Sequence, residues 1–406
     1  MTILLASTVR RHIPANEPSG YLYAIDLEQE KILKKCSIVE PVFRQLDDNP
    51  RGGMRGSKGI AIRTDQLALA NFSMVLRYDP QWNLLGVITH PSCAGIHDIL
   101  FQEDSLWVCS ARTDFLHQFD LQGNILQSFY LREPSPAIAK LKWRPERLLK
   151  PSQMRAGHTD FRNPTTHEKE SYDRAHVNSV GVLSNGDVLV SLGFVFGGEF
   201  ATMLRLKKRL IKWGAWSALR AANRQVRNTL GLAEKNMDNN LVVKPIKAQS
   251  DVVRLSPDGP HELCLELPDM TAPSHSLLVL PDDSAIYLNT SAGEVVHFNP
   301  STRQILSSTK VTDGFLRGVT SLDERCLLLG SRGELIRFNL PSLKTEGRIM
   351  LTEDANEAVY DVKVLPPHYA LPPDSLERHF EQMVGTTAEE VIRGGYNLQL
   401  TGSSLA

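Results

Sequence analysis

The chain has 406 residues, 42% of them hydrophobic, and a formal net charge of −1. This length and apolar content are enough for a large buried core, and the near-neutral charge gives no electrostatic reason to expect a nucleic-acid partner. No run of 18 apolar residues occurs, so the sequence predicts no membrane-spanning helix. The five cysteines lack metal-ligand spacing, and the first residues do not have the pattern of a secretory signal. We therefore expect a reducing compartment, by default the cytoplasm.

A short pattern recurs along the chain: a polar residue, an apolar run, a turn, and a second apolar run that ends in small residues. In chain order, the copies begin near Lys58, His97, His176, His275 and Arg317. Each copy holds several apolar stretches of strand length separated by turn signals. Four short strands about every 40 residues predict the blades of a β-propeller.

A sixth copy is divided between the two ends of the chain. Residues 360–364 have the pattern of an innermost strand with no blade after it, and residues 3–8 and 21–26 look like later strands of a blade. Pairing these segments would close the ring and remove its exposed edges. We therefore predict an all-β, six-bladed β-propeller over residues 1–370, closed by the N- and C-terminal strands. A C-terminal helix and tail are expected over 371–406.

In this repeat pattern the chain resembles the six-bladed propellers of the NHL-like and TolB-like type. The resemblance is one of architecture, because neither the Gly-His and Trp-Asp pairs of WD-repeat blades nor the double glycines of kelch blades recur. Such propellers host hydrolases, lyases, sulfotransferases and pure scaffolds. The resemblance therefore implies a fold and leaves the function open.

Two insertions interrupt the repeat, at about 131–175 and 194–250. In an up-and-down blade, the connection into the first strand and the connection from the second strand to the third leave by the same face. We therefore expect both insertions on one face, which is also where the innermost strands begin. Long loops gathered at one mouth favour a lid over a functional site, and the alternative is a cover for an oligomer interface.

The second insertion contains a segment with helical periodicity and high positive charge. Between residues 203 and 227, apolar residues such as Leu210, Trp213 and Leu219 are interspersed with eight lysines and arginines. This pattern predicts a basic amphipathic helix inserted in the third blade. Its apolar stripe either packs on the rim of the propeller or makes a peripheral contact with an anionic membrane surface.

The first residues of the innermost strands are expected to form a polar ring at the mouth of the central channel. Three imidazoles at equivalent repeat positions, on neighbouring blades, make this ring the candidate functional site. Asn178 follows two residues after the third-blade histidine, on the same side of the strand. Blade by blade, the ring is expected to contain Lys58, His97, His176, His275, Arg317 and Asp361.

Three interpretations of the ring remain open. In the first, His97, His176 and His275 bind a divalent metal ion such as Zn, Mn or Fe and leave a coordination position free for catalysis. In the second, the histidines and Arg317 are catalytic groups that work without a metal. Lys58, Asp361 and Asn178 would then contact the substrate, with an anionic substrate favoured by the cations. In the third, the ring binds only water and backbone groups.

These interpretations lead to two classes of function. One is an enzyme whose active site lies at the lidded mouth of the channel, acting on a small organic substrate by lyase, hydrolase or group-transfer chemistry. The other is a non-catalytic propeller scaffold that binds a protein or membrane partner through its loop-rich face. No feature of the sequence favours a particular oligomeric state.

Overall fold

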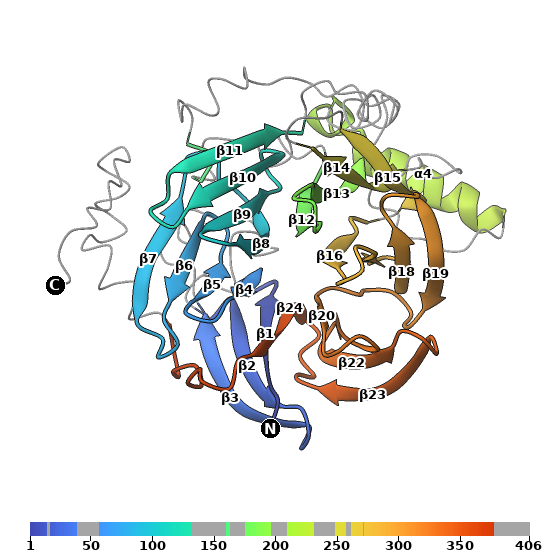
Figure 1. Cartoon of the computed structure of the whole chain (residues 1–406). Coiled ribbons are helices and arrows are strands. Elements are labelled where there is room, and N and C mark those ends of the chain that lie inside the picture. The colour runs from blue at the N-terminus through green and yellow to red at the C-terminus, as the bar shows by residue number, and fades with distance from the viewer. Residues whose placement is uncertain are drawn as a thin grey trace.

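In the computed structural model, the described residues form six four-stranded sheets arranged around a central channel, as Figure 1 shows. This confirms the predicted all-β, six-bladed propeller. The described residues are 1–13, 17–38, 57–131, 160–162, 175–195, 209–230, 248–256, 261–270 and 272–376.

Each blade is an up-and-down sheet, taken here from the channel outward. The first blade contains β4 (Ile60–Ile62), β5 (Leu67–Ala70), β6 (Met74–Tyr78) and β7 (Leu84–Thr89), and the second contains β8 (Ile96–Gln102), β9 (Ser105–Ser110), β10 (Phe115–Asp120) and β11 (Ile125–Tyr130). The third contains β12 (Val177–Val182), β13 (Val188–Val195), β14 (Ala248–Leu255) and β15 (Glu262–Met270), and the fourth contains β16 (His275–Val279), β17 (Ala285–Asn289), β18 (Glu294–Asn299) and β19 (Gln304–Lys310). The fifth contains β20 (Val319–Ser321), β21 (Cys326–Ser331), β22 (Glu334–Asn339) and β23 (Lys344–Met350), and the sixth contains β24 (Glu357–Leu365), β1 (Ile3–Arg10), β2 (Gly20–Asp26) and β3 (Lys31–Ile38).

The sixth blade closes the ring with strands from both terminal regions, as predicted. Strand β24 pairs antiparallel with β1, with Leu4 opposite Val364 and Ala6 opposite Val362. Figure 1 shows the blue and red strands of this blade side by side. Strand β24 contacts both β20 of the fifth blade and β4 of the first, so closure leaves no gap in the ring.

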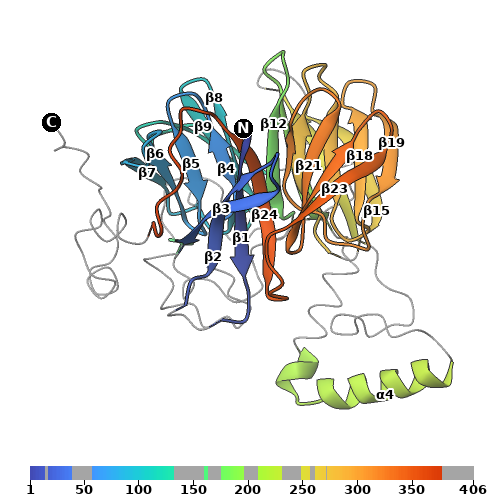
Figure 2. The same ribbon diagram turned by 90° about the horizontal axis from the view of Figure 1, so that it is seen from below.

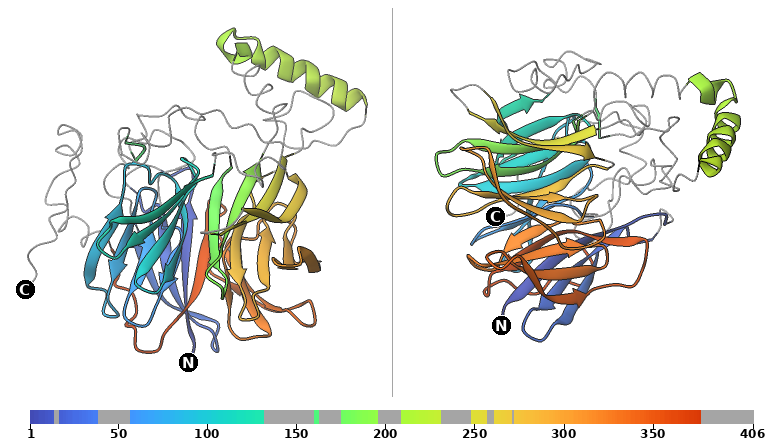
Figure 3. Two further views of the ribbon diagram at one scale, coloured as in Figure 1. Left: turned by 45° about the horizontal axis from the view of Figure 1, so that its top comes forward. Right: turned by 90° about the vertical axis from the view of Figure 1, so that its right-hand side faces the viewer.

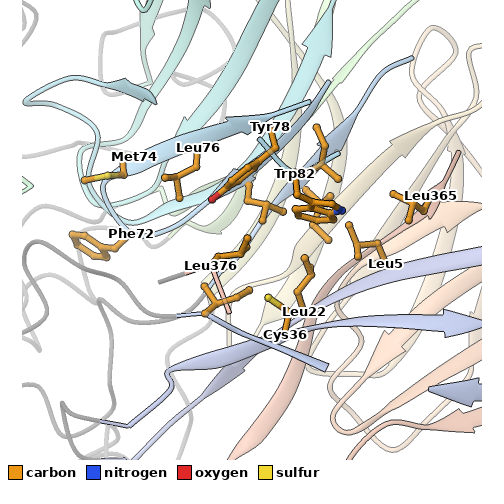
Figure 4. Close-up of a cluster of buried hydrophobic side chains, with 14 of the residues drawn as sticks. Leu5, Leu22, Cys36, Phe72, Met74, Leu76, Tyr78, Trp82, Leu365 and Leu376 are labelled. Carbon is orange, nitrogen blue, oxygen red and sulfur yellow. The ribbon is translucent and has the colours of Figure 1, made fainter. Parts of the chain in front are cut away.

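The hydrophobic core is divided among the junctions between neighbouring blades. The second strand of a blade is buried on both faces because the adjacent blades cover it, as in β9 and β21, whereas the outermost strand β19 is largely exposed. Figure 4 shows the cluster between blades six and one, where Leu5 and Leu22 pack near Tyr78 and Trp82. Each such side chain contributes about 1.5–3 kcal/mol through burial, so closure is stabilised mainly by packing.

The chain beyond β24 continues over the first blade. The indole nitrogen of Trp82 donates a hydrogen bond to the carbonyl of Ala370 over 2.8 Å, and Leu376 packs in the same core cluster. Ser375 forms an isolated parallel bridge with Ser37 and is not helical. The rest of the expected C-terminal helix and tail, from residue 377, lies outside the described residues.

The two insertions join strand ends that lie on one face of the ring. The up-and-down order puts the ends of β11 and β13, and the starts of β12 and β14, on the face where the innermost strands begin. Most residues of both insertions lie outside the described part of the chain. The exception in the second insertion is a helical turn at 209–212 followed by helix α4 (Trp216–Thr229). The helix was predicted over residues 203–227, and α4 ends two residues later.

Helix α4 does not pack on the propeller rim. Figures 2 and 3 show it standing apart from the sheets, and the side chain of Trp213 is 70% exposed. The interpretation in which the apolar stripe covers the rim is therefore wrong for the described residues. No helix in this part of the chain is long and apolar enough to cross a membrane.

Candidate functional site in the central channel

The structure brings the three predicted histidines together at the start of the innermost strands. His97 is the second residue of β8, His275 is the first residue of β16, and His176 directly precedes β12. One ring nitrogen of each lies within 4.8 Å of the corresponding nitrogens of the other two. The His97 ring is stacked on His275 at a centroid distance of 5.5 Å, and His176 meets His97 edge-on at 4.7 Å.

Irregular backbone aims these side chains into the channel. The register of β8 shifts between Ile96 and Ile99, and that of β16 shifts between His275 and Leu277. A β-bulge of this kind re-aims a side chain and is common next to functional sites. His176 has a φ of 53°, a left-handed conformation that costs a non-glycine residue on the order of 1 kcal/mol.

Buried acceptors hold the backbone of His176 and both the backbone and the ring of His275 in place. The Oδ1 atom of Asp114, a fully buried residue, accepts hydrogen bonds from the N–H groups of Ala175 and His176, both over 3.1 Å. Thr290 Oγ1 accepts the N–H of His275 over 3.1 Å and lies 3.3 Å from Nδ1 of the same ring. These contacts support the strained backbone of His176 and orient His275.

A buried arginine completes the cluster. Arg317 precedes β20, is only 5% exposed, and places its Nη2 atom 3.3 Å from His97 Nδ1. Its guanidinium carbon lies 3.4 Å from the ring centroid of Tyr360, a cation–π contact. Among the described residues, Arg317 Nε and the Tyr360 hydroxyl are buried without a hydrogen-bond partner. Buried polar atoms of this kind call for a water, an ion or a ligand group.

The electrostatics of the cluster keep the imidazoles of His97 and His275 neutral. Burial, followed by the charge of Lys58, lowers the pKa of His97 well below its usual value, and burial, followed by Arg317, does the same for His275. Burial also lowers the pKa of Arg317 to about 10, with a further contribution from Arg11. Arg11, at the end of the first strand of the chain, therefore adds a third cation to Lys58 and Arg317.

The predicted ring residue Asp361 lies one position further into the channel than expected. Ser7 pairs with Asp361 and Thr8 with Val359, so Tyr360 is the bulged residue that meets the histidines. The carboxylate of Asp361 accepts hydrogen bonds from the N–H of Ile60 and from Lys363 Nζ, over 2.9 and 3.0 Å. Its role as a substrate contact stays a prediction.

Asn178 lies on β12 and connects neighbouring blades. Its side-chain nitrogen donates to the carbonyl of Ser274, and its oxygen accepts a hydrogen bond from the Ser191 hydroxyl. The nitrogen and the oxygen of the Asn178 amide are therefore both hydrogen-bonded to other residues of the propeller. Lys58, just before β4, is buried, with its ammonium group 5.3 Å from the ring centroid of Phe72 and 6.0 Å from that of Tyr360.

A second carboxylate lies below the cluster. Asp98 accepts the N–H of Ile99 over 2.9 Å and the N–H of Val180, on the next blade, over 3.2 Å. Burial and the neighbouring Asp361 raise the pKa of Asp98 to about 7. The space here is a cavity of about 20 Å³, which is room for about one water molecule or a small ion. Residues that line it are His97, Asp98, Asn178, Ser179, His275, Ser276, Leu277, Arg317, Val319, Tyr360, Asp361 and Lys363.

Four residues of this site were missed from the sequence: Arg11, Asp98, Tyr360 and Lys363. Lys363 had a usable signal, because it follows Asp361 by two residues and strand alternation puts both on one side. Tyr360 had none, since a bulge changes the register by one residue. Asp98 had none either, because simple strand alternation would put it on the side opposite to His97, and only the register shift between Ile96 and Ile99 changes this.

The cluster fits a metal ion, with one competing contact. Three nitrogens on a tetrahedral Zn²⁺ lie about 3.3 Å apart, so a separation of up to 4.8 Å requires the rings to close by about 1.5 Å. Arginine can only donate, so the contact at His97 Nδ1 puts the ring proton of the neutral imidazole on Nε2. A metal on either nitrogen of His97 therefore requires Arg317 to withdraw.

Comparison with known proteins identifies the fold. No protein-family model matches the chain, and no curated protein matches its sequence. A chain of a nidogen/laminin complex and a protein of unknown function from Bacteroides caccae each align with a TM-score of 0.50 and 9% identity, covering 90% of this chain and 98% of theirs. A catalytically inactive virginiamycin B lyase from Staphylococcus aureus, solved with quinupristin, aligns with a TM-score of 0.41 and 10% identity, covering 75% and 72%. At such identities the similarity establishes the propeller fold alone.

Proposed function

We propose that the channel cluster binds a divalent transition-metal ion and that the propeller is an enzyme acting there on a small organic anion. The observation that carries this proposal is the convergence of His97, His176 and His275, from three neighbouring blades, with ring nitrogens within 4.8 Å. Imidazole is a good ligand for Zn, Mn and Fe, and three protein ligands leave a position open for water or substrate. Such an ion supplies Lewis acidity and lowers the pKa of bound water.

The charges around the cluster support an anionic substrate. Lys58 and Arg317 are buried beside the histidines, and the unpaired Nε of Arg317 offers a hydrogen-bond donor. A metal ion next to these cations would be repelled unless an anion lay among them. A carboxylate or phosphate group at the open position meets this requirement, because guanidinium groups bind both. The reaction classes that suit such a site are hydrolysis, lyase chemistry and group transfer.

One contact favours a metal-free alternative. Arg317 Nη2 holds His97 Nδ1 at 3.3 Å, so the neutral imidazole presents its proton on Nε2 and can donate a hydrogen bond to a bound anion. In this alternative the histidines and Arg317 work without an ion. A propeller that binds neither metal nor anion would be the scaffold class.

Metal binding to the full chain distinguishes these functions. Protein freed of metal by chelation is titrated with Zn²⁺, Mn²⁺ and Fe²⁺ by calorimetry, and the native protein is analysed for its metal content. We expect stoichiometric metal in the wild type and a loss in affinity of about 100-fold or more in His97→Ala and His275→Ala. His297→Ala is the matched control, because this histidine lies on β18 and hydrogen-bonds to Ser284.

The outcomes separate the alternatives. Loss of metal in both cluster variants, with retention in the control, supports the proposal. Absence of metal binding in the wild type overturns the metal site, and inorganic phosphate binding that depends on Arg317 would then identify the metal-free alternative. Equal metal binding in all variants would assign the metal to another place on the chain.

A further inference from the structure

Exposed apolar side chains are concentrated in the helical part of the second insertion. Trp213 is 70% exposed and Leu230 is 61% exposed, and a contiguous exposed apolar patch is more informative than one exposed residue. Ile211, Leu219 and Val226, in the same stretch of the chain, are also exposed. The described residues of the propeller do not cover them, so this surface lacks an apolar partner within the described chain.

The same segment is strongly basic. Residues 209–230 contain five lysines and arginines and no aspartate or glutamate, although the whole chain has a net charge of −1. The first turn of α4 also has no acidic residue, which is the usual place for one because of the helix dipole. The lack of acidic residues leaves the positive charge of the segment uncompensated.

The helix separates these two properties around its axis. Leu219 and Val226 are seven residues apart on one face of α4, and Leu230, four residues further on, directly follows the helix. The sequence also has arginines at positions 220, 224 and 227, at steps of four and three residues, which is the spacing of one helical face. An apolar face beside a basic face is typical of helices that lie in the interface of a bilayer.

The helix is also free to reach a flat surface. Figures 2 and 3 show α4 standing away from the sheets, and the insertion that carries it joins the end of β13 to the start of β14. These strand ends lie on the face where the innermost strands begin, which is the face of the histidine cluster. A surface bound by α4 would therefore lie on the side of the channel mouth.

We propose that residues 209–230 bind the surface of an anionic lipid membrane, with the apolar face inserted at the boundary of the acyl chains and the cations at the lipid phosphates. A lipid surface accommodates both faces at once, since it offers an apolar layer beneath a negatively charged one. A nucleic acid would neutralise the cations but leave Leu219 and Val226 in water. This contact is independent of the chemistry at the histidine cluster.

Vesicle co-sedimentation of the full chain tests the proposal. We expect binding to vesicles with about one third phosphatidylserine, weakening with salt, and little binding to pure phosphatidylcholine. The triple variant R220Q/R224Q/R227Q should bind about 100-fold more weakly, at about fivefold for each cation removed. The variant L219Q/V226Q should bind at least about tenfold more weakly, because it removes the inserted groups.

A charge-matched control separates a specific helix contact from general electrostatics. The variant K31Q/R325Q/K344Q removes three exposed cations from the propeller and should bind like the wild type. Equal weakening by the control and the α4 triple variant would overturn the proposal. So would unchanged binding of L219Q/V226Q, equal binding to neutral vesicles, or capture of RNA or of an acidic protein in place of anionic vesicles.

Discussion

Replacing Arg317 by methionine tests whether the buried guanidinium serves a ligand or the fold. The depression of its pKa from 12.5 to about 10 means that keeping this cation in the folded protein costs about 3 kcal/mol. Two contacts of the guanidinium offset this cost. The stack on Tyr360 contributes about 1–2 kcal/mol, and the long hydrogen bond to His97 contributes about 1 kcal/mol. Methionine is also apolar and flexible enough to fill the space. We therefore expect Arg317→Met to change the free energy of unfolding by less than about 1 kcal/mol, since the gain and the losses nearly cancel.

The assay is urea denaturation in metal-free, anion-free buffer, with Arg254→Met as the control. Arg254 contacts Glu262 and Asp187 and is 19% exposed, so its loss leaves two carboxylates without this partner and should cost about 1–3 kcal/mol. Arg317→Met should also bind Zn²⁺ about tenfold more tightly, because His97 is released from a competing hydrogen bond. A loss of more than about 3 kcal/mol in Arg317→Met, with no gain in metal affinity, would refute this reasoning and make the guanidinium a structural group.

Two further predictions concern the histidines and their support. Because the folded-state pKa values of His97 and His275 lie below the unfolded value, the unfolded chain binds more protons as the pH falls below about 6.5, and stability is lost in acid. The double variant H97N/H275N should therefore lose less stability than the wild type when the pH falls from about 6.5 to 5. The difference should be up to about 1.4 kcal/mol per pH unit for each histidine. If the free energy of unfolding has the same slope against pH in both proteins, the two histidines are not buried in the neutral form. Asp114→Ala should lower the free energy of unfolding by about 2–4 kcal/mol and weaken metal binding, because two buried N–H groups lose their acceptor, whereas Asp114→Asn should retain most of both. Metal binding unaffected in a folded Asp114→Ala protein would show that this carboxylate does not position His176.

The close approach of cations and imidazoles explains why the channel is a better candidate site than the rest of the described surface. Within the described residues, the channel combines a buried arginine whose Nε atom has no hydrogen-bond partner with three converging histidines. Burying an unpaired donor costs stability, and proteins accept costs of this kind at functional sites. The small cavity also favours an ion or a compact anionic group over a bulky ligand within the described channel.

The architecture could be predicted because it depends on local periodicity repeated many times. Strand alternation and turn residues recur in each blade, and no blade can bury its faces alone, so the count of blades and the closure through β24 and β1 follow from the pattern. The equivalent positions of His97 and His275 follow from the same repeat. The helical periodicity of residues 203–227 likewise predicted a basic helix inserted in the third blade.

The details of the site depended on contacts that no periodic pattern encodes. A bulge in β24 moves the register by one residue, so Tyr360 meets the histidines where Asp361 was expected. Arg317 reaches His97 because the fifth and second blades face one another across the channel, and it stacks on Tyr360 of the neighbouring sixth blade. The sequence also could not predict whether Trp213 is exposed. An amphipathic pattern indicates that the helix has an apolar face, but not whether that face packs on the propeller or on another surface. The repeat in the sequence therefore determined the ring and its histidines, and tertiary packing decided which side chains meet at its centre.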